Sequence, residues 1–504
     1  MNGYAIIEGK KVIFSFEDNN LTLMFNTKAE VDVRVPEIDL IEFGGEIPFV
    51  IGYDFSYQKC YIFLVREKVE LSFFHSGTVH VRGYIELNVC YSETENKKYL
   101  PLFSGMSLYG KEINAFYNVD RAYRFELPQK EQNNFSGIVG TMPPNETKEK
   151  FNFIVGEESI EVNFGIETLY RHSNTPLELT PRIQFKFDET KSIYRLIRLY
   201  HIYKSFFQFV TYRRNVDTSR VVLYGKNEVK DFTIVGMFYY DPDQLEAEDE
   251  KKVRNIVSYE MIKSHIVKIF DEISSDNLYV QHIPDSKNNA RVITPARFVL
   301  IMAAFEWNVR HVYEITSGEN EKVVKQDILD AMERVPLEKG YTKELKKKYK
   351  FFRKIIERVD VNLSGKIAYA LNDLHDILSP FIEHIYALNG KEVDKYEMMG
   401  DRLQAQRNNF AHGNLDREFD TDVVLDIIIL EWVNHAMVLK KFGYTENEIR
   451  DLINVIFNRN MYFPKTNSIE TKKQNFNNIN KKRFLTRTSE RFVNRRRFPK
   501  KSKN

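Results

Sequence analysis

The apolar residues of this 504-residue chain have mostly strand-like spacing before about residue 250 and helical spacing after it. Before that point, β-branched and aromatic residues gather in short runs at 11–16, 59–65, 69–74 and 79–89, and several of these runs alternate apolar and polar residues. Such alternation is typical of half-buried strands, and turn residues separate the runs at short intervals. We therefore expect an antiparallel β-sandwich or barrel in the N-terminal half.

One helix is expected inside this half, over residues 192–214, and strand-like runs return over 221–240. The highly charged stretch 241–254 is the predicted boundary of the β-rich region. From about residue 257 the apolar spacing becomes helical. Thr294-Pro295 is a typical helix start, and apolar residues then recur at spacings of four and three.

Further helices are predicted over residues 322–334, 342–359, 365–388, 394–412, 421–442 and 446–457. Thr445 and Glu448 form a capping-box pattern at the start of the last one. The predicted fold class is α+β: an N-terminal antiparallel β-sandwich or barrel-like domain (1–250) followed by an α-helical bundle (256–460). Residues 461–504 are predicted to be a basic, flexible tail.

The charge of the chain is concentrated at its C-terminal end. The formal net charge is +2, yet residues 459–504 contain 15 Lys and Arg against two Glu. Phenylalanines interleave with these cations, a composition that suits single-stranded nucleic acid because bases stack on rings while cations hold phosphates. The alternative is a solvated charged tail with no specific role. RNA is the polyanion that we expect as partner.

The cysteines, the apolar runs and the absent motifs limit where the protein works and which cofactors it uses. The two cysteines, Cys60 and Cys90, have no paired-motif spacing, which favours a reducing compartment over a disulfide framework or a zinc ribbon. The longest apolar run, 298–305, is far shorter than the ~20 residues of a membrane-spanning helix. A cytoplasmic protein without a membrane partner is therefore expected. No metal-binding or nucleotide-binding motif is present, so neither metal nor cofactor is expected.

The segment 407–413 carries the chemistry that we single out. It places Arg407, Asn408 and His412 at the end of a predicted helix, with Gly413 as the stop signal. Spacing alone is weak evidence, because Arg195 and His201 show a similar spacing inside an ordinary amphipathic helix. The Asn directly after Arg and the Gly directly after His distinguish the 407–413 copy.

Histidine titrates near neutral pH and suits proton transfer, whereas the planar guanidinium of arginine bridges phosphate oxygens. His412 is expected to act on the RNA 2′-hydroxyl as a base, directly or through a water, or alternatively as the acid that assists the leaving oxygen. The competing interpretation is structural. Arg407 would then pair with Asp401 or Asp416 while His412 caps a helix end.

Arg-Asn-x-x-x-His at the end of a bundle helix resembles the catalytic motif of the HEPN superfamily. Together with a β-rich N-terminal domain, it resembles the bacterial ApeA-type anti-phage proteins. The resemblance implies a metal-independent endoribonuclease that cuts tRNA or other RNA, works as a homodimer or higher homo-oligomer, and halts infected cells after a phage-derived trigger. Arg407, Asn408 and His412 occupy the motif positions. The resemblance also implies an acidic residue that supports the arginine, and Glu306 is the candidate, unless it simply pairs with Arg310.

Two other function classes stay open. In the first, the helical part dimerises, the β-rich domain binds a viral protein or ligand, and the motif is not catalytic. In the second, the β-rich half is a carbohydrate-binding or carbohydrate-processing unit, for which we find no supporting site in the sequence. Cell toxicity with RNA fragmentation, lost in His412→Ala and Arg407→Ala, separates the nuclease from the non-catalytic scaffold.

Overall fold

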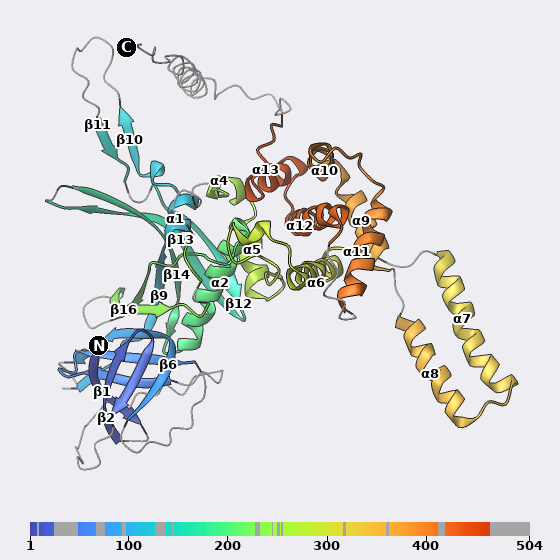
Figure 1. The fold of residues 1–504 in the computed structure, drawn as a ribbon. Coiled ribbons are helices and arrows are strands. Elements are labelled where there is room, and N and C mark those ends of the chain that lie inside the picture. The colour runs from blue at the N-terminus through green and yellow to red at the C-terminus, as the bar shows by residue number, and fades with distance from the viewer. Residues whose placement is uncertain are drawn as a thin grey trace, which may run out of the picture. The chain divides into compact units, whose positions relative to one another are not determined.

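The computed structural model describes residues 1–7, 10–24, 49–66, 76–92, 97–126, 138–143, 146–172, 174, 176–226, 232–243, 245–248, 253, 256–315, 319–358, 362–411 and 419–463. This part of the chain is α+β, with antiparallel strands in its N-terminal region and helices in its C-terminal region (Figure 1). Residues 1–460 form one compact unit and residues 461–504 a second. The expected strand at 69–74 and all but three residues of the expected tail lie outside the described residues.

The first six strands form a closed antiparallel barrel. They are β1 (Asn2–Ile7), β2 (Lys10–Glu17), β3 (Asn20–Met24), β4 (Phe49–Asp54), β5 (Lys59–Val65) and β6 (Ser76–Asn88). Their order is β6-β3-β2-β1-β4-β5, and β5 pairs in turn with β6, which closes the ring. The long strand β6 makes closure possible because its first residues pair with β3 and its later residues with β5. Of the two expected architectures, the N-terminal strands adopt the barrel.

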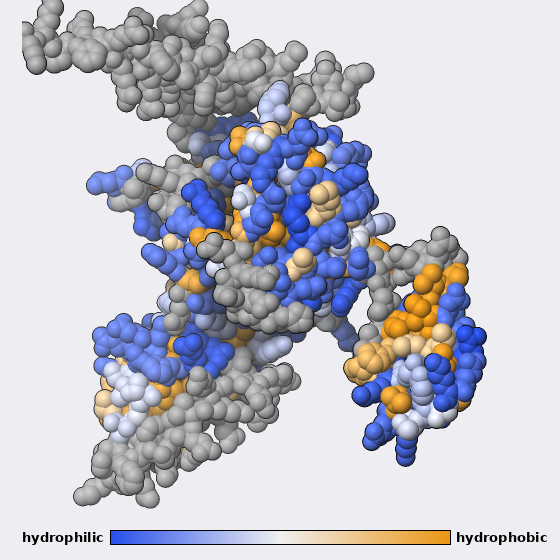
Figure 2. All heavy atoms as spheres, turned by 45° about the vertical axis from the view of Figure 1, so that its right-hand side comes forward, coloured by the Kyte–Doolittle hydropathy of each residue, from blue (hydrophilic) through white to orange (hydrophobic). Residues whose placement is uncertain are grey.

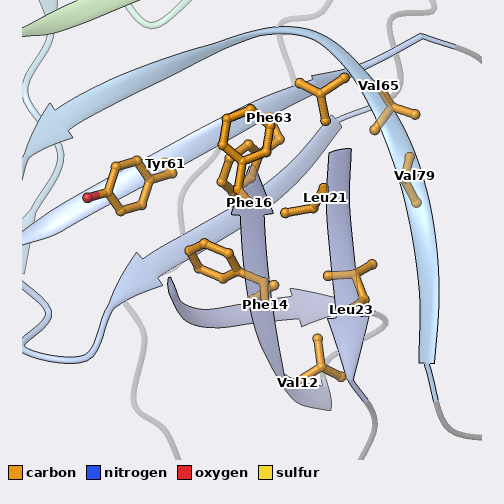
Figure 3. Packing of buried hydrophobic residues seen from close by; sticks show 11 residues of the cluster. Val12, Phe14, Phe16, Leu21, Leu23, Tyr61, Phe63, Val65 and Val79 are labelled. Carbon is orange, nitrogen blue, oxygen red and sulfur yellow. The ribbon is translucent and has the colours of Figure 1, made fainter. Parts of the chain in front are cut away.

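Apolar side chains that alternate along the strands fill the barrel (Figure 3). On β2, Phe14 and Phe16 are buried, whereas Ile13 before them is 42% exposed. The ring centroids of Phe14 and Phe16 lie 5.3 and 5.0 Å from that of Phe63 on β5. Gly52 leaves room for this cluster, since a Cβ there would lie 2.7 Å from the Phe14 ring.

Strand β6 also begins a second, open part of the sheet. The order continues from β6 as β16-β15-β9-β14-β13-β12. These strands are β9 (Phe103–Tyr109), β12 (Glu149–Val155), β13 (Glu158–Tyr170), β14 (Leu177–Thr190), β15 (Arg220–Gly225) and β16 (Thr233–Tyr240). Two small antiparallel pairs stand apart: β7 (Cys90–Ser92) with β8 (Lys97–Tyr99), and β10 (Tyr123–Glu126) with β11 (Ile138–Thr141).

Helices pack on this open sheet through aromatic side chains. They are α1 (Lys111–Phe116), α2 (Ile193–Thr211), α4 (Tyr259–Ile262) and α5 (Ile266–Ser274). The ring of Phe270 on α5 lies 4.6 Å from that of Phe206 on α2 and 5.2 Å from that of Phe153 on β12. Thus α5, which follows the predicted boundary at residue 250, packs against the sheet and against α2. The expected helix at 192–214 is confirmed as α2.

The C-terminal helices surround α12. They are α6 (Pro295–Val312), α9 (Leu363–Asp373), α10 (His375–Leu388), α11 (Tyr396–Ala411), α12 (Thr421–Phe442) and α13 (Glu446–Ile456). Helix α12 contacts α6, α9, α10, α11 and α13, and its Trp432 is fully buried. Thr294 caps α6, and the capping box of Thr445 and Glu448 is formed, as predicted. None of the described helices is long and apolar enough to cross a membrane.

Helices α7 (Glu319–Glu338) and α8 (Lys343–Arg358) form an antiparallel pair with apolar side chains left uncovered (Figures 1 and 2). Val324 and Ile328 on α7 are 57% and 42% exposed. Leu345 and Phe352 on α8 are 42% and 50% exposed. Each helix therefore keeps part of its apolar stripe in contact with solvent.

The strand-rich and helical parts of residues 1–460 are joined by buried contacts. Tyr212, just after α2, donates a hydrogen bond of 2.6 Å to Glu431 on α12. The ring of Phe209 stacks on that of His435 at 4.3 Å. Because these groups are buried, the two parts are packed together as one unit.

Burial of His435 makes a pH-dependent contribution to stability. It lowers the pKa of His435 to about 3, so the folded state keeps this imidazole neutral while the unfolded chain protonates it near pH 6.5. Unfolding then takes up a proton, and this contribution is fully present above pH 6.5 and lost as the pH falls toward 3. In His435→Phe, the decline of the unfolding free energy with falling pH should be shallower by up to about 1.4 kcal/mol per pH unit.

Denaturant unfolding of the wild type and His435→Phe at several pH values between 7 and 5 measures this difference. His282 provides the comparison, since burial also lowers its pKa to about 3, and His282→Phe should flatten the same limb. Exposed His172 is the control, and His172→Phe should leave the slope unchanged. Equal slopes for all four proteins would contradict the prediction.

Candidate active site

Helix α11 carries two of the three motif residues. Its buried stripe recurs at spacings of four, three and four residues, through Met399, Leu403, Gln406 and Phe410. Arg407 and Asn408 follow Gln406 in the sequence and therefore lie to the side of this buried stripe. The Arg407 side chain is accordingly 42% exposed, and Asn408 is exposed.

Arg402 fixes α11 against its neighbours. Its Nε and Nη2 donate hydrogen bonds of 2.7 and 2.9 Å to the two carboxylate oxygens of Asp426 on α12, and its Nη1 donates one of 2.8 Å to Asp394. The hydrogen bond to Asp426 raises the pKa of Arg402, while burial raises the pKa of Asp426. Arg407 lies five residues further along the same helix, about 7.5 Å at ~1.5 Å per residue.

Helix α6 brings Glu306 to Arg407. Arg407 Nη2 lies 3.7 Å from Glu306 Oε1, and the Glu306 side chain is 32% exposed. This distance is beyond that of a good hydrogen bond, so the contact is a loose ion pair. Among the described residues, Arg407 has no hydrogen-bond acceptor. The pair therefore holds the guanidinium without using its N–H groups in a hydrogen bond.

The other ion-pair partners expected for Arg407 and Glu306 are not seen among the described residues. Asp401 accepts a hydrogen bond of 2.7 Å from the Ser364 hydroxyl, and Asp416 lies outside the described residues. Within the described part of the chain, the ion pair of Glu306 is with Arg407 and not with Arg310. The structure thus brings together two of the four candidate site residues, Arg407 and Glu306.

His412 lies outside the described residues, and Asn408 has no hydrogen-bond partner among those described. In a regular helix, side chains five residues apart point about 140° away from each other. Helix α11 ends at Ala411, one residue before His412, so this separation does not have to hold for the Arg407–His412 pair. The negative end of the helix dipole lies at this terminus.

Three phenylalanines tie together the two ends of the segment that contains His412. Phe410 precedes the segment and Phe419 follows it, and their ring centroids are 5.2 Å apart. Both rings also pack on Phe298 of α6, at 5.7 and 5.9 Å. The residues that flank the segment of His412 therefore meet in one aromatic cluster between α6 and α11.

Sequence reasoning gave no role to Arg402 or to its carboxylate partners. Those partners are 8 and 24 residues away, so no local spacing identifies them. It also gave no role to Phe298, Phe410 and Phe419 as a group. Phe298 was expected in the core of its helix, but nothing in the sequence showed that the three rings meet.

The arrangement can hold a phosphate at Arg407 and place Asn408 beside it on the solvent side of α11. Among the described residues, no group of three or more His, Cys, Asp or Glu is placed to hold a metal ion. Comparisons with protein-family models, with curated proteins and with solved structures each found no match. Function is therefore inferred from the chemistry of the motif residues in this setting.

Proposed function

We propose that this chain is a metal-independent endoribonuclease whose helical region is of the HEPN type. The observation that carries the proposal is the half-exposed guanidinium of Arg407, which is held loosely by Glu306. Arg407 lies near the end of α11 and five residues before His412 in the sequence. A structural arginine would have its donors satisfied by buried acceptors, as Arg402 has. Arg407 instead has no hydrogen-bond acceptor among the described residues, and we propose that a phosphate takes that place.

His412 removes the proton from the RNA 2′-hydroxyl, directly or through a water. The 2′-oxygen then attacks the adjacent phosphorus, the bond from phosphorus to the 5′-oxygen breaks, and that oxygen takes up a proton. The products are a 2′,3′-cyclic phosphate and a 5′-hydroxyl. Arg407 neutralises the charge that develops on the phosphate oxygens, and Asn408 orients the phosphate or the imidazole by hydrogen bonding. A protonated imidazole can serve as the acid for the leaving oxygen.

The cellular role that we propose is anti-phage defence of the ApeA type. The strand-rich N-terminal region acts as sensor of a phage-derived trigger, and cleavage of tRNA or other RNA halts the infected cell. The buried contacts of Tyr212 and Phe209 with α12 support this proposal because they join the strand-rich and helical regions directly.

Total RNA incubated with the purified full chain tests the chemistry. Fragments that carry cyclic phosphate ends, formed equally with and without EDTA, are the expected result. Fragmentation that stops with EDTA would overturn the metal-independent mechanism. Absence of cleavage by wild-type protein, together with toxicity that does not depend on Arg407 or His412, would favour the non-catalytic scaffold.

The homodimer that we propose is joined through α7 and α8. Between residues 323 and 338, α7 carries four carboxylates against two cations, whereas α8 carries seven cations against one carboxylate between residues 343 and 354. Both helices also expose apolar side chains, described above. A second copy related by a two-fold axis places each α7 against the partner's α8, which covers both apolar stripes and pairs opposite charges in a four-helix arrangement.

Phe352→Glu and Ile328→Glu should each convert the dimer to a monomer, because each places a charge inside the proposed apolar contact. Light scattering coupled to size exclusion would then give the chain mass of 59.7 kDa in place of twice that value. Gln326→Glu adds the same charge on α7 at an exposed polar position and should remain dimeric. A monomeric wild type, or a dimer in both apolar variants, would refute this interface.

A further inference from the structure

A cavity of about 810 Å³ lies where the end of α2, the segment before α6, and helices α12 and α13 meet. Its volume is in the range of small-molecule sites. The three candidate site residues that the structure describes, Arg407, Asn408 and Glu306, do not line it. Phe419 does line it, and the same ring packs on Phe410 of α11.

Cations predominate along the cavity wall. Among the described residues, Lys287, Arg291, Arg297 and Arg459 line it, against one carboxylate, that of Glu431. That carboxylate is already occupied, because Arg297 Nη2 lies 2.5 Å from it and Tyr212 donates a hydrogen bond of 2.6 Å to it. Arg291 is exposed and has no ion pair with any described residue. Among the described lining residues, cations therefore outnumber carboxylates, which favours an anionic ligand.

The side chains of Trp432 and Arg459 stack on each other at the wall of the cavity. The Arg459 guanidinium lies 4.5 Å above the centre of the Trp432 ring. Trp432 is fully buried, yet its Nε1 has no hydrogen-bond partner among the described residues, and neither have Nε of Arg459 and Nε of Arg297. A buried N–H without an acceptor costs about 1–3 kcal/mol, which a ligand acceptor can recover. Planar groups also stack favourably on such arginine and aromatic surfaces.

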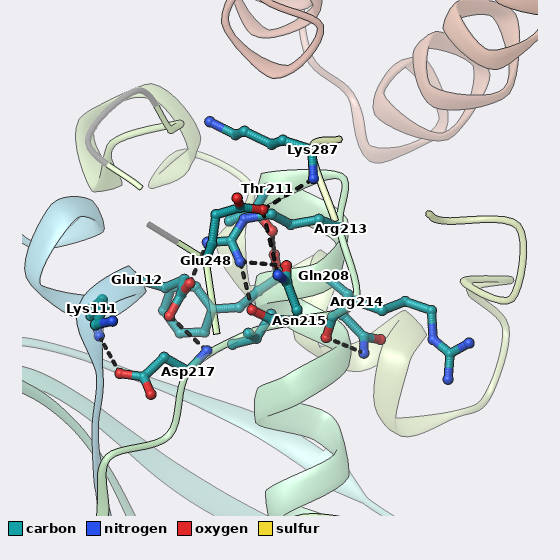
Figure 4. Close-up of polar contacts among 12 residues, drawn as sticks. Lys111, Glu112, Gln208, Thr211, Arg213, Arg214, Asn215, Asp217, Glu248 and Lys287 are labelled. Atoms are coloured by element: carbon teal, nitrogen blue, oxygen red, sulfur yellow. Dashed lines mark hydrogen bonds and ion pairs between the residues drawn. The ribbon is translucent and has the colours of Figure 1, made fainter. Parts of the chain in front are cut away.

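The wall that carries Lys287 is held in place by buried polar contacts (Figure 4). The Glu248 carboxylate accepts hydrogen bonds from the Lys287 backbone nitrogen at 3.1 Å and from Asn215 Nδ2 at 3.4 Å. Asn215 is in turn held by the buried Arg213 guanidinium, which pairs with Glu112. Figure 4 shows the Lys287 side chain extending away from this network. The site is therefore preorganised on this side.

We propose that this cavity binds a nucleoside polyphosphate. The excess cations fit a chain of phosphates, and the stacked surface with unmatched N–H donors fits a base that offers ring nitrogens or carbonyl oxygens as acceptors. The bound ligand touches Phe419, and through it the aromatic cluster from which the chain leads to His412. This inference concerns binding and does not require the chain to cut RNA.

ATP and GTP are the probes, and the fluorescence of Trp432 is the readout. The chain has two tryptophans, so Trp307→Phe, made in the full-length protein, leaves Trp432 as the only one. We expect saturable quenching by at least one of the two nucleotides, with weaker competition by inorganic triphosphate or by the nucleoside alone. Quenching by neither nucleotide at millimolar concentration would overturn the proposal.

Two variants in the same background locate the bound nucleotide. Arg291→Gln removes an exposed cation without touching the core. Ile428→Phe places a larger side chain of α12 in the cavity and keeps Trp432 as the only tryptophan. Each should weaken binding at least tenfold, whereas Arg334→Gln on α7 should not. Unchanged affinity in both cavity variants, or binding of a single-stranded RNA oligonucleotide with no binding of ATP or GTP, would refute a nucleotide site here.

Discussion

Arg407→Ala and His412→Ala are each expected to reduce the rate of RNA cleavage by a factor of about 10² to 10³. Removal of one group that stabilises transition-state charge, or of one positioned acid or base, has effects of this size. Arg407 meets the geometric requirement, because among the described residues its half-exposed guanidinium makes only the 3.7 Å contact to Glu306. Neither substitution removes a buried contact among the described residues, so folding should be preserved. Initial rates on a labelled RNA measure the loss.

Graded variants separate charge from geometry at the same position. Arg407→Lys keeps the cation but loses the planar fork, and its rate should fall between those of the wild type and Arg407→Ala. Glu306→Gln removes only a loose, exposed ion pair, worth at most about 1 kcal/mol, so a loss of no more than about fivefold is expected. Glu306 is thus a positioning residue in this proposal.

Matched controls come from the turn after β13. Arg171 and His172 are adjacent exposed residues, and Arg171 forms a surface ion pair of 3.0 Å with Glu178. Arg171→Ala and His172→Ala should cleave RNA at the wild-type rate. Wild-type rates in Arg407→Ala or His412→Ala as well would remove the nuclease proposal, whatever the state of the dimer.

Local signals in the sequence predicted the boundaries of several elements. Thr294 before Pro295, and Thr445 with Glu448, are caps whose chemistry is complete within four residues, and both were confirmed. The break inside the expected helix 365–388 was not predicted. It falls at Leu374, an apolar residue with no turn signal, whereas Pro380, a typical helix breaker, lies inside α10.

The alternation of apolar and polar residues did not show which strands pair with each other. A period of two shows which side chains of a strand are buried but not which strand lies beside it. Whether the β region was a sandwich or a barrel depended on β5 pairing with β6 while β6 also pairs with β3, more than 50 residues earlier. The same limit applies to the site, since Arg407 and Glu306 are 101 residues apart and only the family resemblance suggested that they meet.

Replacing Arg213 by alanine should lower the free energy of unfolding by about 3–5 kcal/mol, because it leaves the Glu112 carboxylate buried without its cation. Both side chains of this pair are fully buried. Arg213 also donates a hydrogen bond of 2.6 Å to the Asn215 carbonyl, and Glu112 accepts one of 2.9 Å from the Asp217 backbone nitrogen. The pair therefore fixes the chain that follows α2 (Figure 4).

The next residue supplies the control for this prediction. Arg214 is also an arginine with carboxylate partners, but its contacts of 3.4 Å to Asp243 and 3.3 Å to Asp285 lie at the surface. Arg214→Ala should cost no more than about 1 kcal/mol, since solvent screens such pairs. The double variant Arg213→Met with Glu112→Leu should recover much of the loss, because it removes both buried charges together. Denaturant unfolding at pH 7 compares the four proteins, and equal losses for Arg213→Ala and Arg214→Ala would show that burial does not determine the strength of these pairs.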